Sequence, residues 1–375
     1  MTRTDVVIVG GGPVGLFLGC RLAQLGIDFK ILEARTSPLI HSRSIGIHPP
    51  SLEKLRHIGV AQTLIEKGVQ VRGGYAFANK MCLGYLGFEG CPKPYTFVLA
   101  LPQHDTERIL AERLCELAPG ALERGVKVIG LEHGPDSVTV TTNNGAIQGQ
   151  LVVGCDGKDS TVRSLSNISF DGHAYSDTYM MGDFADTTDF DDDAAIYLTD
   201  EGLVESFPLP GKARRWVLKT DAYVSEPSTE RLAQQLKERI GLEVIEDTNS
   251  MLSSFGVQHY LAHSFAKGRV FLAGDAAHVV SPIGGQGMNL GWLDAWSLAQ
   301  KIEDFLEERV SLEATGRAYT LERKRATKTA SRRAELNMML GRKTPLAKLK
   351  YLAVWGGLRT PLRTAAARVF TMRWL

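Results

Sequence analysis

Apolar runs alternate with segments of helical periodicity at the start of the chain. Residues 5–9 form an apolar, β-branched run that leads into three consecutive glycines, Gly10 to Gly12. From residue 13 to residue 25 apolar and small side chains recur at helical spacing, and residues 28–32 form a second apolar run. This order predicts a strand, a glycine-rich turn, a helix and a strand, which make the first half of a dinucleotide-binding unit.

The pattern beyond that unit predicts further helices and strands. Helices are predicted over residues 51–67, 105–117, 290–308 and 310–335, with Asp105 placed to cap the second. Strands are predicted over residues 126–129, 137–141, 151–153 and 270–272, with a turn at 143–145. The acidic stretch 176–260 carries alternating pieces typical of a largely antiparallel sheet, at 194–198, 203–207 and 216–219.

These elements predict a mixed α/β (α+β) fold in which a Rossmann-like domain is interrupted by an inserted domain. The inserted domain is expected to be a mixed, largely antiparallel sheet, and C-terminal helices follow. We assign residues 1–72, 98–170 and 256–310 to the Rossmann-like domain. Residues 73–97 and 171–255 are assigned to the sheet domain, and residues 311–375 to a basic helical segment.

Charge is spread unevenly along the 375 residues. The formal net charge is +1, which gives no reason to expect a nucleic-acid partner. From Arg323 to the end, however, 14 Lys and Arg stand against one acid, Glu335. Residues 341–375 also carry Leu, Val, Phe and Trp, so the segment is expected to cap the Rossmann-like domain with its apolar side. The alternative is peripheral contact with an anionic membrane, in which case the substrate would be lipophilic.

The cysteines and the N-terminus bear on the compartment. The five cysteines are odd in number, widely spaced and without a C-x-x-C pair, which predicts a reduced, cytoplasmic chain without a bound metal. The apolar run 6–18 holds four glycines and follows Asp5, which fits a strand and turn better than a signal peptide. No run of about 18 apolar residues occurs, so no membrane-spanning helix is expected.

The first glycine cluster has the spacing of a dinucleotide fingerprint. Gly10 permits a tight turn, Gly12 lets the backbone approach a pyrophosphate, and Gly15 lets the helix pack closely on the strand. The pyrophosphate would lie at the positive end of the helix. Glu33 ends the second strand, where its carboxylate can accept hydrogen bonds from ribose hydroxyls. An acid at this place argues against an NADP 2′-phosphate in the same site.

Two further stretches select FAD among the dinucleotides. They are residues 154–163 (GCDGKDSTVR) and 268–278 (GRVFLAGDAAH), and the second continues through 281–289 (SPIGGQGMN). At these residues the chain resembles the group A flavoprotein monooxygenases, the family of para-hydroxybenzoate hydroxylase. The resemblance covers residues 1–310 and keeps the three motifs in order. It is specific for the family and poorly specific for the substrate.

The chemistry of the third stretch follows from its residue types. Asp275 comes after a strand and a glycine, so its carboxylate can bond a ribityl hydroxyl. Gly284 to Gly287 lead into a helix whose free N–H groups can face the flavin edge where negative charge gathers on reduction.

The resemblance adds roles for individual residues. It implies that Pro282 lies near the reactive carbon of the flavin, the only catalytic role that it suggests. Asp156 and Arg163 are tied to both FAD and NAD(P)H, although a simple turn and a surface ion pair are the alternatives. Arg43 and Gln103 contact the cofactor, and Arg35 and Val128 lie near adenine. The full cofactor-binding set is Gly10, Gly12, Pro13, Val14, Gly15, Glu33, Ala34, Arg35, Arg43, Gln103, Val128, Asp156, Gly157, Arg163, Gly274, Asp275, Pro282, Gly285, Gly287, Met288 and Asn289.

The reaction implied by the resemblance is a hydroxylation. NADPH or NADH reduces FAD, O2 adds to form a C4a-hydroperoxide, and this species hydroxylates an aromatic or polycyclic substrate held by the inserted sheet. The chain has no second Gly-x-Gly-x-x-Gly, so no separate domain for the pyridine nucleotide is expected. Baeyer–Villiger or epoxidising oxygenation, and a non-oxygenating FAD reductase or dehydrogenase, remain alternatives.

No catalytic base can be chosen from the sequence. The histidines considered are His48, His173, His259 and His278, and a structural role is at least as common for each. Three tyrosines of the inserted sheet could line the substrate site, although aromatic residues in a sheet usually belong to its core. They are Tyr175, Tyr179 and Tyr197.

Overall fold

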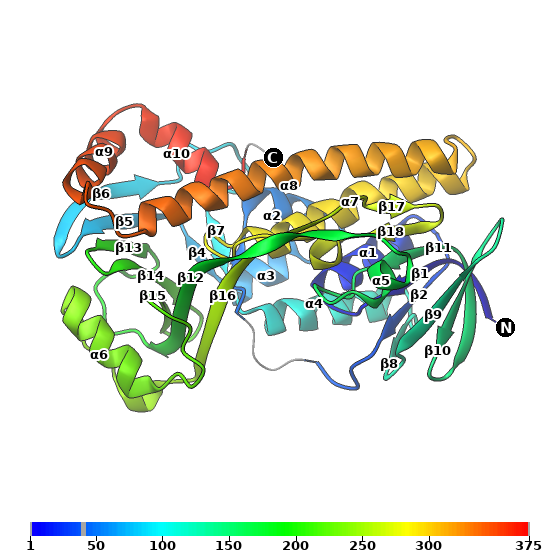
Figure 1. Cartoon of the computed structure of the whole chain (residues 1–375), viewed down its shortest axis with the longest axis horizontal. Coiled ribbons are helices and arrows are strands. Elements are labelled where there is room, and N and C mark those ends of the chain that lie inside the picture. The colour runs from blue at the N-terminus through cyan, green and yellow to red at the C-terminus, as the bar shows by residue number, and fades with distance from the viewer. Residues whose placement is uncertain (1, 39–42, 374–375) are drawn as a thin grey trace.

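Two eight-stranded sheets lie at opposite ends of the molecule, and long helices run between them (Figure 1). The computed structural model describes residues 2–38 and 43–373. The first sheet has the order β17-β18-β11-β1-β2-β8, with β10 and β9 added beside β11. Its strands are β1 (Thr2–Val9), β2 (Phe29–Glu33), β8 (Leu122–Arg124), β9 (Val128–His133), β10 (Val138–Thr142), β11 (Gly145–Gly154), β17 (Ala266–Lys267) and β18 (Val270–Leu272).

Parallel pairing explains why the first sheet has continuous apolar strands. β1 pairs in parallel with β2 and β11, β11 pairs with β18, and β2 with β8. Helices cover these strands, so Val6, Val7 and Ile8 are all fully buried. The helices of this half are α1 (Pro13–Gln24), α2 (Pro49–His57), α3 (Ala61–Lys67), α4 (Gln103–Leu117), α5 (Thr161–Leu165) and α7 (Gln286–Leu306).

The second sheet has the order β19-β16-β12-β15-β14-β13-β5-β6. It is antiparallel except where β13 pairs with β5. Its strands are β5 (Gly73–Ala78), β6 (Met81–Gly87), β12 (Phe170–Ala185), β13 (Ala194–Thr199), β14 (Gly202–Leu209), β15 (Ala213–Thr220), β16 (Met251–Ala262) and β19 (His278–Val279). A small antiparallel sheet stands between the two large ones and contains β3 (Gly46–Ile47), β4 (Val69–Val71) and β7 (Val98–Ala100).

Alternation along the strands gives the second sheet two different faces. Val204 and Trp216 point to one side and pack with Leu232 and Leu236 of helix α6 (Thr229–Ile240). Leu203 points to the other side, which faces the rest of the molecule. The confirmed fold is therefore the mixed α/β architecture predicted from the sequence. The long strands β12 and β16 pair with each other on either side of an irregularity between Ala174 and Thr178.

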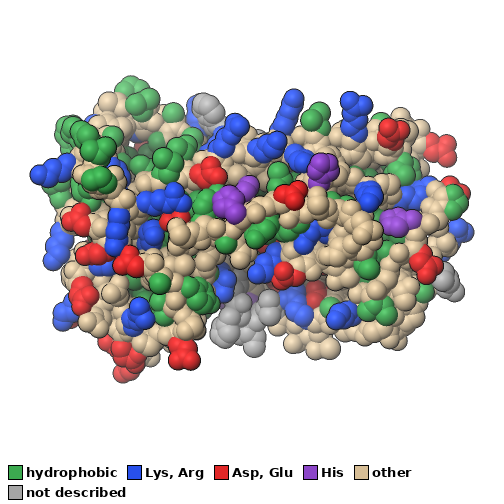
Figure 2. Space-filling view, in the orientation of Figure 1, with side chains coloured by type: hydrophobic (Ala, Val, Ile, Leu, Met, Phe, Trp, Pro, Cys, Tyr) green, Lys and Arg blue, Asp and Glu red, His purple; other side chains and the backbone are tan. Residues whose placement is uncertain are grey.

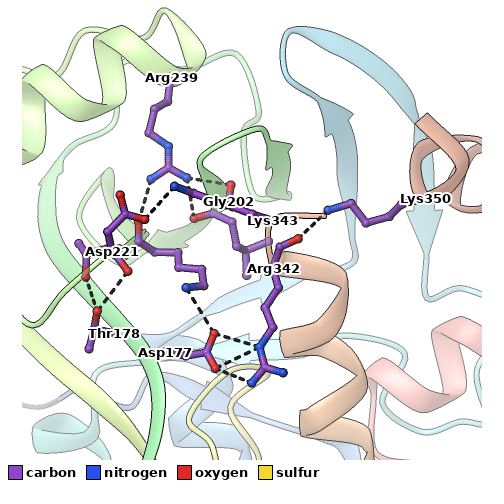
Figure 3. Close-up of polar contacts among 11 residues, drawn as sticks. Asp177, Thr178, Gly202, Asp221, Arg239, Arg342, Lys343 and Lys350 are labelled. Atoms are coloured by element: carbon purple, nitrogen blue, oxygen red, sulfur yellow. Dashed lines mark hydrogen bonds and ion pairs between the residues drawn. The ribbon is translucent and has the colours of Figure 1, made fainter. Parts of the chain in front are cut away.

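The C-terminal segment runs back over the second sheet. Helix α8 (Leu312–Gly341) extends along both halves, and α9 (Ala347–Arg359) and α10 (Leu362–Phe370) follow above β6 (Figure 1). Beyond α8, Arg342 forms an ion pair with the buried carboxylate of Asp177, and Lys343 pairs with the exposed Asp221 (Figure 3). The sequence analysis predicted that this segment caps the Rossmann-like domain alone. In the structure α9 packs on β6, the edge strand of the second sheet.

Several predicted boundaries differ from the structure for local reasons. The helix predicted over residues 51–67 is broken into α2 and α3, because Gly59 adopts φ +84°, which ends the first helix. Asp105 does not cap α4. That helix begins at Gln103 after Pro102, and Asp105 instead pairs with Arg108 one turn further on.

Candidate active site

One cavity connects the two sheets. Its volume is about 1400 Å³, and its walls come from all three sequence motifs, from the inner face of the second sheet and from α8 to α10. At one end lie Gly12, Glu33 and Asp156, and at the other end lie Leu203 and Val217. A single space therefore joins the predicted dinucleotide site to the inserted sheet.

The start of α1 opens onto this cavity. Gly12 precedes the helix, and a Cβ atom added there would have no heavy atom within 4 Å, so the backbone borders empty space. Gly15 has the opposite environment, since its Cβ would lie 2.0 Å from the carbonyl oxygen of Gly10. The two glycines thus act differently: Gly12 leaves room for a ligand, whereas Gly15 allows the helix to lie against the turn.

Glu33 organises the same end of the cavity. Its carboxylate accepts hydrogen bonds from the backbone N–H of Gly11 at 2.7 Å and from the N–H and Nε of Arg35 at 2.8 and 2.9 Å. Burial acts to raise the pKa of Glu33, but these hydrogen bonds outweigh it and hold the pKa below its usual value. A ribose hydroxyl at this carboxylate would therefore compete with the Arg35 side chain.

The second motif is tied to the third by Arg163. Its guanidinium donates to the carbonyl oxygens of Lys158 at 2.7 Å and Ala276 at 3.0 Å, and it lies over the ring of Phe170. Arg163 is buried and does not line the cavity, so it makes no surface ion pair, and the tie to FAD and NAD(P)H that the resemblance implies stays a prediction. Its side chain connects the loop at Lys158 to the loop at Ala276 on the side away from the cavity.

Asp156 borders the cavity and also stabilises the start of α5. Its carboxylate accepts from the hydroxyl of Ser160 at 2.5 Å and from the backbone N–H of Val162 at 3.0 Å. Burial raises its pKa above the usual range for Asp. The neighbouring Gly157 adopts φ +80°, so the Asp-Gly pair does form a turn, and that turn faces the cavity.

Asp275 presents a carboxyl group to the cavity from the third motif. The side chain is accessible from the cavity, but protein surrounds it, and this burial raises its pKa. Within residues 2–38 and 43–373 it has no hydrogen-bonding partner for its side chain. A carboxyl group of this kind fits a ligand hydroxyl, as the ribityl chain of FAD would supply.

Behind Asp275 lies a buried cluster that the sequence analysis missed. The carboxylate of Asp294 in α7 is hydrogen-bonded to Nε2 of His278 at 2.6 Å, to Nε of Arg323 at 2.7 Å and to the backbone N–H of Gly274 at 3.1 Å. Burial acts to raise the pKa of Asp294, but its interactions with His278 and Arg323 outweigh that effect, and the net shift is downward. An acid within the apolar stripe of a helix was the available signal. Because His278 is fully buried and does not line the cavity, its role is structural.

Asn289 fixes the glycine-rich loop that precedes α7. Its side-chain amide donates to the carbonyl oxygens of Gly285 at 2.7 Å and Gly46 at 2.9 Å, and its oxygen accepts the backbone N–H of His48 at 2.8 Å. His48 in turn places Nε2 3.0 Å from the carbonyl oxygen of Gly284. Burial lowers the pKa of His48 to about 4, so this ring is neutral near pH 7.

Arg43 stands where the two halves meet. Its Nε donates to the hydroxyl of Ser253 at 3.2 Å, and its guanidinium lies 5.9 Å from the ring centre of Phe255. Its carbonyl oxygen accepts Nη1 of Arg215, whose charge is matched by Asp183 at 2.7 and 2.8 Å. Arg43 therefore contacts the inserted sheet while it lines the cavity.

The structure brings most of the predicted residues to the cavity. Those that line it are Gly10, Gly12, Pro13, Val14, Glu33, Ala34, Arg35, Arg43, Gln103, Val128, Asp156, Gly157, Asp275, Pro282, Gly285, Gly287 and Met288. Those that stand behind its wall are Gly15, Arg163, Gly274 and Asn289. Each of these four supports a residue or loop that does face the cavity.

Most of the other candidates do not reach the cavity wall. Of the four candidate histidines, His48 lines it, whereas His173 and His259 face each other across β12 and β16; His104, which the sequence analysis did not consider, lines it as well. Tyr175 donates to Glu335 at 2.7 Å, and Tyr197 packs on the α6 side of the sheet. Tyr179 stacks on Phe255 within the inner apolar cluster.

The substrate end of the cavity is mostly apolar. Alternate residues of neighbouring strands form its wall, among them Ile196, Leu198, Leu203, Phe207 and Val217. One acid, Glu205, stands among them, and the sequence analysis did not single it out. Across residues 2–38 and 43–373, no group of His, Cys, Asp and Glu is arranged to hold a metal ion. The same residues include no helix both long and apolar enough to cross a membrane.

Comparison with known proteins places these features in context. A family model described as "FAD binding domain" matches residues 3–334. A rifampicin monooxygenase of Streptomyces venezuelae is 33% identical over 316 residues, which cover 81% of this chain and 66% of that protein. The chain spans just under two thirds of the length of the curated relatives that it matches first.

Solved structures show the same fold. The p-nitrophenol 4-monooxygenase of Pseudomonas putida DLL-E4 is similar with a TM-score of 0.90 at 23% identity, over 100% of this chain and 98% of that one. The anhydrotetracycline hydroxylase OxyS of Streptomyces rimosus is similar with a TM-score of 0.82 at 29% identity, over 100% of this chain and 77% of that one.

Proposed function

Because the chain belongs to the FAD-binding-domain family of the group A aromatic hydroxylases, we propose that it is an FAD-dependent monooxygenase of aromatic or polycyclic substrates. NADPH or NADH and O2 are the proposed co-substrates. The observation that carries the proposal is the single cavity, which runs from Gly12 and Glu33 to the apolar wall of the second sheet. A cofactor at one end and a ring substrate at the other would share one continuous space.

The residues around the first end fit FAD. Gly12 leaves open space beside the start of a helix, where a pyrophosphate binds favourably. Asp275 offers a carboxyl group without a side-chain partner among the described residues, and the loop at Gly285 and Gly287 brings bare backbone to the cavity. When bound, FAD supplies the redox chemistry with NAD(P)H and O2, and the protein holds the substrate and excludes water.

The chain's own groups set the conditions for that chemistry. His48 is neutral near pH 7 and fixes the loop next to Pro282 through Gly284. Asn289 fixes the same loop from α7. The proposed role of both residues is positioning, because their polar atoms bond the backbone of the loop.

The test is an absorption spectrum of the purified protein, followed by NAD(P)H and O2 consumption with and without a panel of phenols and polycyclic quinones. We expect bound flavin, with reduction and O2 uptake accelerated by one class of ring compound and a hydroxylated product. An inserted ring oxygen or an epoxide would favour the alternative oxygenases. Fast reduction without O2 incorporation would favour a reductase, and protein that takes up no FAD would refute the proposal.

Peripheral membrane contact is a second, separate proposal for the C-terminal helices. Apolar side chains gather over α9 and α10 on the surface (Figure 2). Leu349 and Leu352 are each 61% exposed, and Lys348 is exposed beside them. We expect sedimentation with anionic liposomes that is lost in Leu349→Glu/Leu352→Glu. Equal sedimentation of this variant and the wild type would contradict membrane contact through these helices.

A further inference from the structure

Glu205 is a buried acid whose side chain has no polar partner among residues 2–38 and 43–373. It lies in the middle of β14, is 8% exposed and lines the cavity. On the same face its neighbours across the sheet are Ile196 of β13 and Val217 of β15. Leu203 and Phe207 flank it along its own strand, so the carboxyl group stands in apolar surroundings on all four sides.

The charges nearest to this wall are already engaged. Two charged residues lie on the inner face of β15: Arg215 is bound by Asp183 of β12 and by the carbonyl oxygen of Arg43, and Lys219 pairs with Asp177 of β12 at 3.3 Å. The facing strands β4 and β7 carry no charged side chain. Tyr179 of β12 leaves its buried hydroxyl without a partner among the described residues and makes no hydrogen bond to Glu205. Burial alone raises the pKa of Glu205 to about 7.

The position of Glu205 also relates it to the predicted redox end of the cavity. Ile283 follows Pro282 and packs in the same apolar cluster as Leu203 and Val217. A ring lying on this wall would therefore have one edge at Glu205 and another toward the loop at Pro282. A buried acid without a partner is costly, because its polar atoms lose water without gaining a hydrogen bond.

We propose that Glu205 is the polar anchor of the substrate half of the cavity and accepts a hydrogen bond from a ring hydroxyl. The inference rests on the proposed function and narrows its substrate class. It selects neutral, hydroxyl-bearing aromatic compounds. Unsubstituted rings leave the acid unpaired, and ring carboxylates bring a second negative charge next to it.

The experiment compares three ring compounds that differ only at one substituent: 2-naphthol, naphthalene and 2-naphthoate. Binding to the FAD-loaded enzyme is followed at pH 8 by the fluorescence of the naphthyl ring, in the absence of NAD(P)H. We expect 2-naphthol to bind at least about tenfold more tightly than naphthalene, because a hydrogen bond to a charged group contributes a gain in affinity of about that size. We expect 2-naphthoate to bind more weakly than 2-naphthol.

Two variants and a control assign the preference to this residue. Glu205→Leu should bring the affinities of 2-naphthol and naphthalene to within about twofold and strengthen the binding of 2-naphthoate about tenfold. Glu205→Gln should retain part of the naphthol preference, because the amide oxygen still accepts, and should lose the discrimination against 2-naphthoate. Glu201→Gln removes a 60% exposed acid from the same hairpin and should change nothing.

Each contrary result overturns the inference. A naphthol preference unchanged in Glu205→Leu would place the polar contact elsewhere, and tight binding of 2-naphthoate to the wild type would point to Arg43. Wild-type protein that binds none of the three compounds would also refute it. Because binding is measured without turnover, these outcomes are separate from a failure of the enzyme to oxygenate.

Discussion

Gly12 and Gly15 belong to one fingerprint but have different physical tasks. A methyl group at Gly15 would collide with the backbone of the preceding turn, so that position concerns folding. A methyl group at Gly12 would meet no protein atom and would instead occupy the space beside the start of α1. The effect of a side chain at Gly12 should therefore fall on the ligand.

The Gly12→Ala variant is expected to fold normally and to bind FAD at least about tenfold more weakly, which is 1.4 kcal/mol. Titration of the apoprotein with FAD, followed by flavin fluorescence, measures this. Gly356→Ala in α9 is the matched control, because its added methyl group also meets no atom within 4 Å but lies away from the cavity wall. Equal FAD affinity in the two variants would show that no phosphate approaches Gly12.

Glu205 makes stability depend on pH in a defined direction. Burial raises its pKa from 4.5 to about 7, so the folded protein holds a proton that the unfolded chain has already released. The loss of folding stability from this buried acid is therefore absent below pH 4.5, grows as the pH rises, and reaches its full size once the pH has passed 7.

We therefore compare the change in the free energy of unfolding that Glu205→Gln causes at two pH values. This change should be more favourable to the folded state at pH 8 than at pH 5, by on the order of 2 kcal/mol. Urea denaturation of the apoprotein at both pH values provides the measurement. A difference of the opposite sign would mean that the ionised carboxylate has a stabilising partner.

Helix α8 and the two helices after it act as one element that closes the substrate end. Leu340 of α8, Leu358 of α9 and Phe370 of α10 line the cavity. Their attachment depends on the residues just after α8. The Arg342–Asp177 pair involves a carboxylate only 2% exposed, whereas the Lys343–Asp221 pair is largely exposed. Arg342 itself is 41% exposed, and Asp177 also pairs with Lys219 at 3.3 Å. Removing a partner of the buried Asp177 carboxylate should still cost more than removing one from the exposed pair.

Arg342→Gln is expected to loosen the cap, so proteolysis between residues 342 and 375 should accelerate by about tenfold or more, while FAD binding stays unchanged. Lys343→Gln is the control and should change the cleavage rate less than twofold, since exposed pairs contribute little. Protease sensitivity that rises equally in both variants would show that the Arg342–Asp177 pair does not fix these helices.

At the scale of the whole molecule, the cavity couples the two sheets. Its walls are shared by the first sheet, the second sheet and the C-terminal helices, so a ligand that binds the folded state should stabilise all of them together. Adding FAD to the apoprotein at about 100 times its Kd should stabilise the fold by about 2.7 kcal/mol.

Circular dichroism measures the corresponding rise in Tm, a few degrees for a chain of this size, and one transition is expected. Two transitions, of which only one responds to FAD, would show that the halves unfold independently.

Much of the architecture was determined locally, and so the sequence predicted it. The strand, turn and helix around Gly10 to Gly15 follow from glycine conformation and apolar spacing, as do β13 to β15 from alternation. The residues of the three motifs likewise follow one another in short, contiguous stretches. For this reason the sequence named most of the cavity's first end, from Gly12 to Asp275.

Tertiary structure alone decided what depends on contacts between distant segments. Asp294 lies 16 residues from His278 and 29 from Arg323, and only folding joins them. Alternation along β14 predicts that Glu205 shares a face with Leu203 and Phe207. It does not predict which face of the strand borders the cavity. The C-terminal cap had the same ambiguity, because a basic amphipathic segment fits several acidic surfaces. The spatial partner, here Asp177 and the edge at β6, is a property of the folded chain.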